Sequence, residues 1–69
     1  MTFEEFIVRA QSFRACNPEV RLGQAYMVVL HDANYDLYNE VMEPGLVPLD
    51  PFYDDKNIGR FLAFIAERW

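Results

Sequence analysis

The stretch LGQAYMVVL, residues 22–30, decides the fold, because it is apolar on nearly every side apart from Gly23 and Gln24. A helix that is apolar all round is normally the buried, central helix of a domain. The alternative is a short buried strand, since residues 28–30 read Val-Val-Leu and β-branched residues favour strands. We expect a helix, because signals for a helix start precede this stretch.

Those signals are Asn17, Pro18 and Glu19. Asparagine favours the N-cap, proline the first helical position, and an acidic side chain the positive end of the helix dipole. We therefore expect Asn17 to cap the central helix. Gly23 costs this helix about 1 kcal/mol relative to alanine, and we expect the glycine to let a neighbouring segment approach closely.

A first helix is predicted from near Phe3 to near Cys16, because Thr2 and Glu5 have the spacing of a capping box. We expect Cys16 to be a small buried residue. The apolar stripe of this helix recurs at helical spacing and comprises Phe3, Phe6, Ile7, Ala10 and Phe13.

The second half of the chain predicts a short helix, a loop and a final helix. Asn34 can cap the short helix, and Pro44-Gly45 ends it. We expect residues 44–55 to form an ordered acidic loop, and the final helix to start near Asp55 or Asn57. The apolar positions are Leu37, Tyr38, Val41 and Met42 in the short helix and Ile58, Phe61, Leu62, Ile65 and Trp69 in the final one.

These segments together predict one all-α domain over residues 1–69. We expect a compact small bundle of three main helices plus one short helix, with the acidic loop packed on it. Each helix is short and needs its neighbours for stability. In a chain of 69 residues, burial offsets the conformational entropy only narrowly, so association with a partner is a natural source of further burial.

The composition excludes several classes of protein. With 11 acidic and 6 basic residues the net charge is -5, which opposes direct binding to nucleic acid or to anionic lipid. Cys16 is the only cysteine, so no disulfide forms within one chain. Neither a signal segment nor a membrane-spanning run is evident, and we expect a cytoplasmic protein.

Acidic residues and tyrosines gather in the middle of the chain. From Leu22 to Asp55 there are seven acidic residues and no lysine or arginine. One interpretation is a solvated surface that keeps a small protein soluble. The other is a surface that docks on a basic partner, with tyrosines providing contact area. The candidate partner-binding residues are Tyr35, Asp36, Tyr38, Glu40, Glu43 and Tyr53.

The four tyrosines are not expected to share one environment. We expect Tyr26 inside the core, because it lies in the apolar central stretch. At least one of Tyr35, Tyr38 and Tyr53 should be exposed, and exposure of two or more would favour a binding surface.

Catalytic and metal-binding patterns are weak. His31 and Asp32 are adjacent, and neighbours on a helix project about 100° apart, so we expect them not to face each other. A histidine at a helix end that interacts with carbonyls or the dipole is the preferred interpretation. Asp50, Asp54 and Asp55 lack the glycine and terminal glutamate of a calcium loop. We expect no enzyme, no catalytic residue, no bound metal and no cofactor.

A structural pairing is predicted between the central helix and the loop. Arg21 can form a forked ion pair with Asp54 or Asp55, and Gln24 can bond loop carbonyls near residues 49–50. Such a fork predicts that Arg21→Ala destabilises the fold by more than the roughly 1 kcal/mol of a surface pair.

The strings RLGQ at residues 21–24 and DPFYDD at residues 50–55, followed by Phe61, resemble a group of small hypothetical proteins of bacteriophages and prophages. The resemblance covers most of the chain from Asn17 onward and implies expression inside a bacterial cell. It brings no activity or catalytic residue with it. Small accessory phage proteins often bind and modulate a host protein.

Charge, tyrosines and resemblance together lead us to expect a non-enzymatic interaction protein. Its partner would be a bacterial host protein, bound through the acidic, tyrosine-rich segment. The alternative is a structural or assembly protein that acts as a homodimer, whose interface supplies the burial that the short chain lacks.

Overall fold

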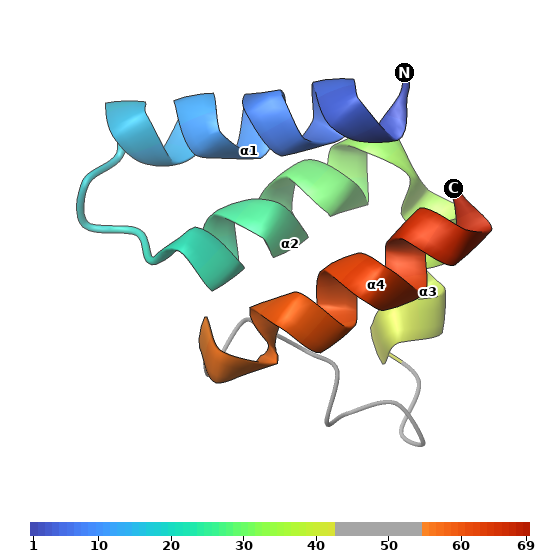
Figure 1. Ribbon diagram of the computed structural model, residues 1–69. Helices are drawn as coiled ribbons and strands as arrows, with labels where there is room; N and C mark the ends of the chain where they lie inside the picture. The colour runs from blue at the N-terminus through green and yellow to red at the C-terminus, as the bar shows by residue number, and fades with distance from the viewer. Residues whose placement is uncertain (43–54) are drawn as a thin grey trace.

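The computed structural model describes residues 1–42 and 55–69 and shows an all-α fold (Figure 1). Of the loop expected over residues 44–55, residues 44–54 lie outside this part of the chain, whereas Asp55 begins a 3-10 turn. None of the described residues belongs to a strand. The helices are α1 (Phe3–Cys16), α2 (Leu22–Ala33), α3 (Tyr35–Met42), the 3-10 turn η2 (Asp55–Asn57) and α4 (Ile58–Arg68).

Helix α1 begins and ends where the sequence predicts. The Thr2 hydroxyl accepts a hydrogen bond from the Glu5 backbone N–H at 3.1 Å, and the Glu5 carboxylate accepts one from the Thr2 N–H at 2.9 Å. This capping box satisfies two backbone donors that a helix start otherwise leaves open.

The expected role of Asn17 is wrong. Asn17 is the C-cap of α1: its side-chain amide donates to the Phe13 carbonyl at 2.9 Å, and its backbone N–H donates to the Arg14 carbonyl at 3.1 Å. The residue before a proline is disfavoured in helical geometry, so Pro18 ends α1 at this position. Residues 18–20 form a turn, and α2 starts only after Arg21.

Helix α2 is the central element, as its composition predicts (Figure 1). The ring of its Tyr26 is buried and lies between Phe6 of α1, at 5.7 Å, and Phe61 of α4, at 6.0 Å between ring centroids. Because residues 22–30 lie within this helix, the strand alternative for the stretch is excluded. The buried core comprises Phe6, Ala10, Ala25, Tyr26, Met27, Val29, Leu30, Leu37, Val41, Phe61 and Ile65.

Asn34 joins α2 to α3 by serving both helices. Its backbone N–H donates to the Leu30 carbonyl at 2.8 Å, and its side-chain oxygen accepts from the Leu37 N–H at 3.2 Å. Leu37 is buried as predicted, whereas Met42 at the end of the expected apolar face is 44% exposed. The tight corner fixes the direction of α3 relative to the end of α2.

The two ends of the described chain meet at α1 and α4. The indole Nε1–H of Trp69 donates to the Met1 carbonyl at 2.9 Å. The Trp69 ring packs 5.1 Å from Phe6 and 6.0 Å from Phe3, measured between ring centroids. Trp69 thus closes the core between the start of α1 and the end of α4.

Candidate interaction face

The last turn of α2 and the first turns of α3 carry the side chains that the sequence singles out. Tyr35, Asp36 and Glu40 are exposed, and Tyr38 is partly buried. The candidates Glu43 and Tyr53 lie outside the described residues. We call the described surface the acidic–aromatic face; it consists of His31, Asp32, Tyr35, Asp36, Tyr38 and Glu40.

Three aromatic rings form the centre of the acidic–aromatic face. The Tyr35 and Tyr38 rings are stacked, with an interplanar angle of 13° and 6.2 Å between their centroids. The His31 ring stands edge-on to both, 5.0 Å from Tyr35 and 4.9 Å from Tyr38. Edge-on and offset arrangements of this kind are favourable aromatic contacts. The rings hold one another in place, although Tyr35 remains 55% exposed.

The expectation that His31 and Asp32 do not face each other is wrong. His31 Nδ1 lies 3.5 Å from Asp32 Oδ1, because both exposed side chains at the end of α2 turn toward one another. His31 occupies the last turn of α2, where the helix dipole favours a basic group. Ser12 and Cys16 lie on α1, so the pair has no nucleophile from the neighbouring turns of its own helix.

The segment that carries the three rings also carries three exposed carboxylates and, apart from His31, no basic residue. Asp32, Asp36 and Glu40 are exposed, and residues 22–42 contain no lysine or arginine. The Asp32 side chain is 77% exposed and that of His31 is 53% exposed. The acidic–aromatic face therefore combines negative charge with accessible ring surface.

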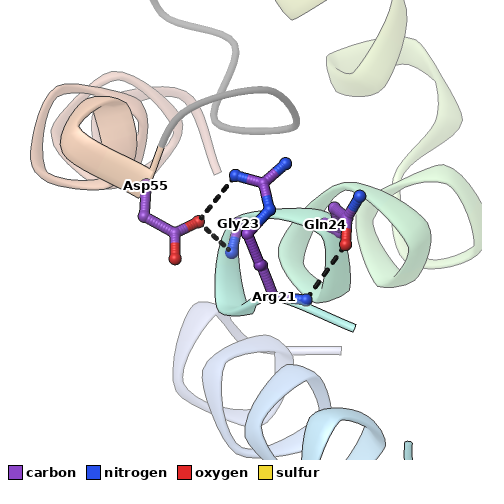
Figure 2. A network of polar contacts seen from close by, with 4 residues as sticks. All are labelled: Arg21, Gly23, Gln24 and Asp55. Atoms are coloured by element: carbon purple, nitrogen blue, oxygen red, sulfur yellow. Dashed lines mark hydrogen bonds and ion pairs between the residues drawn. The ribbon is translucent and has the colours of Figure 1, made fainter. Parts of the chain in front are cut away.

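Asp55 joins the start of α2 to η2 (Figure 2). Its Oδ1 lies 3.7 Å from Arg21 Nη1 and accepts a hydrogen bond from the Gly23 N–H at 3.1 Å. The ion pair expected between Arg21 and Asp54 or Asp55 is thus present with Asp55, and Asp54 lies outside the described residues. The side chains of Arg21 and Asp55 are 43% and 45% exposed, so this contact is weaker than the fork that the sequence suggested.

Gln24 and Gly23 have roles that the sequence did not reveal. The Gln24 Oε1 accepts a hydrogen bond from the Arg21 N–H at 3.0 Å (Figure 2), and residues 49–50, its expected partners, lie outside the described chain. Gly23 presents an open N–H at the helix start, and Asp55 accepts from it. The first backbone N–H groups of any helix lack partners within the helix, so the start of α2 could be expected to need acceptors such as Gln24 and Asp55.

Cys16 is exposed, which corrects the expectation of a buried thiol. The residue lies about 120° around α1 from the buried Ala10, outside the apolar stripe. Within residues 1–42 and 55–69 no group of three or more His, Cys, Asp or Glu side chains is placed to hold a metal ion. None of the described helices has the length and apolar character to cross a membrane.

Comparisons with family models, with curated proteins and with solved structures find no match to this chain.

Proposed function

We propose that the protein is a non-enzymatic interaction protein that binds a basic segment of a partner protein through the acidic–aromatic face. The observation that carries the proposal is Tyr35, which is 55% exposed yet held against Tyr38 and His31. An ordered, accessible tyrosine provides contact area at a low entropic cost, and tyrosine is enriched in protein interfaces.

The charges around Tyr35 support a cationic partner. Asp36 and Glu40 lie one turn apart on α3, and Asp32 lies at the end of α2. A guanidinium or ammonium group stacked on an exposed tyrosine ring gains from the ring quadrupole, and adjacent carboxylates add to this attraction. The resemblance to phage and prophage proteins suggests a bacterial host protein as this partner.

Affinity capture from a bacterial lysate tests the proposal with matched variants. The test variant is Asp36→Lys with Glu40→Lys, and the control is Glu19→Lys with Glu67→Lys, whose positions are also exposed. Both variants change the net charge equally, so nonspecific electrostatic binding changes equally. The proposal expects one captured protein to be lost with the test variant and with Tyr35→Ala but kept with the control.

Two results contradict the proposal. One is a capture pattern that the test variant and Tyr35→Ala leave unchanged; the other is equal loss with test and control variants. A partner that the proposal fits binds the wild-type chain directly once purified, and added salt weakens the binding because the attraction is between charges.

A further inference from the structure

The outward side of α1 carries a second surface that the acidic–aromatic face does not use. A shallow hollow along this helix is lined by Met1, Thr2, Glu4, Glu5, Val8, Arg9 and Ser12. Val8 is 61% exposed, the highest value among the large hydrophobic side chains of the described chain, and Met1 is 53% exposed. Figure 1 shows that α2 and α4 both lie on one side of α1, which leaves its other side uncovered by these two helices.

We propose that this outer surface of α1 pairs with the same surface of a second copy of the chain, with the two helices antiparallel. A twofold interface requires a surface that is complementary to itself. The charges of α1 meet this requirement, because Glu5 and Arg9 occupy one flank of the hollow at positions i and i+4.

The geometry of an antiparallel pair fixes the register. A twofold axis at the level of residue 7 places Glu5 of each copy opposite Arg9 of the other. It brings the two Val8 side chains together, offset by about 3 Å along the helix axes. The exposed Val8 side chains thus occupy the centre, and both pairs of opposite charges lie along one flank of them, one toward each end of the contact.

The charged groups are available for this pairing. Arg9 forms no ion pair with any residue of the ranges 1–42 and 55–69. Glu5 is exposed, although its Oε1 accepts the capping-box hydrogen bond from the Thr2 N–H. The facing surface of a single helix is smaller than a standard interface, so we expect a weak dimer with a dissociation constant of about 100 μM.

Sedimentation equilibrium of the wild-type chain and two charge variants tests the register. Glu5→Lys alone places an ammonium group opposite Arg9 of the second copy, and Arg9→Glu alone places two carboxylates opposite each other. Each variant therefore weakens self-association by about tenfold. In an equimolar mixture the two variants can form a mixed dimer. At one contact Arg9 of the first variant faces Glu5 of the second, and at the other the introduced lysine faces the introduced glutamate. Both contacts are then again between unlike charges. We expect the mixture to associate within about threefold of the wild-type affinity.

A pair of valine variants tests the apolar centre. Val8→Gln removes the central contact and reduces association by about tenfold, whereas Val28→Gln, at an exposed valine of α2, leaves it unchanged. Circular dichroism verifies that each variant keeps its helix content. A chain that stays monomeric up to about 1 mM, a dimer insensitive to Val8→Gln and Arg9→Glu, or a mixture that does not recover would each overturn the proposal. These results are independent of the acidic–aromatic face.

Discussion

The carboxylate of Asp55 accepts a hydrogen bond from the backbone N–H of Gly23, 32 positions earlier in the chain, at an N–O distance of 3.1 Å. One side chain of η2 thereby satisfies a donor at the start of α2, and its negative charge lies where the α2 dipole is positive. The contact connects the segment that follows residue 54 to the central helix.

Removal of this carboxylate is expected to destabilise the fold. Asp55→Ala lowers the free energy of unfolding by about 1–2 kcal/mol, because the Gly23 N–H loses a charged acceptor in a half-exposed site. A double-mutant cycle with Arg21→Ala gives a smaller coupling of about 0.2–1 kcal/mol for the ion pair. Urea denaturation followed by circular dichroism measures both. A coupling as large as the whole Asp55→Ala effect would show that the ion pair, and not the Gly23 bond, dominates.

Trp69 is expected to stabilise the packing of α4 against α1. Trp69→Ala lowers the free energy of unfolding by about 2 kcal/mol, because it removes the ring contacts with Phe3 and Phe6. Trp69→Phe keeps an aromatic ring but loses the bond to the Met1 carbonyl and some of the packing area of the larger indole, so its cost is smaller, about 0.5–1 kcal/mol. Thermal unfolding ranks the two variants, and equal midpoints would contradict the assigned role of the ring.

Glu5 makes the stability depend on pH on the acid side. The hydrogen bonds from the Thr2 backbone N–H and hydroxyl lower the pKa of the Glu5 carboxyl below its ordinary value of 4.5. A depressed folded-state pKa adds stability above the unfolded pKa, and this contribution is lost as the pH falls through the folded pKa. Glu5→Gln keeps an acceptor for the Thr2 N–H but cannot titrate. The stability difference between wild type and Glu5→Gln should shrink as the pH falls from about 5 to about 2; a constant difference contradicts the assignment.

Tyr26 makes the stability depend on pH on the alkaline side. Burial raises the pKa of its phenol above the ordinary value of 10.0, and a hydrogen bond with the Gln11 side chain opposes this shift. The folded state binds the proton more tightly, so this contribution to stability is complete below about pH 10 and falls as the pH rises from there through the folded pKa. Unfolding of Tyr26→Phe should depend less on pH in this alkaline range than that of wild type. Parallel pH profiles would mean that burial does not raise the pKa of the Tyr26 phenol.

Local signals in the sequence predicted the elements that depend on neighbours in the chain. The Thr2–Glu5 box and the Asn34 cap follow from residue types at fixed spacing, and both are present. Asn17 illustrates the limit of such signals. An asparagine at this position can end one helix or start the next. Here it ends α1, because its side chain bonds the Phe13 carbonyl and Pro18 follows it.

Contacts between distant segments were harder to predict. The pairing of Gly23 with Asp55 requires knowledge of how η2 meets α2, which no local pattern contains. The aromatic contacts of His31 were missed because the two tyrosines approach only after Asn34 turns the chain. The exposure of Tyr35 agrees with the expectation that at least one tyrosine outside the central stretch faces solvent.

The hydrogen bond between Trp69 and Met1 places the two ends of the described chain side by side. A short peptide can join the two ends, and new ends can be opened in the turn at residues 18–20 between α1 and α2. In such a circular permutant α2 becomes the first helix made and α1 the last. The order of synthesis can thus be separated from the order of packing around Tyr26.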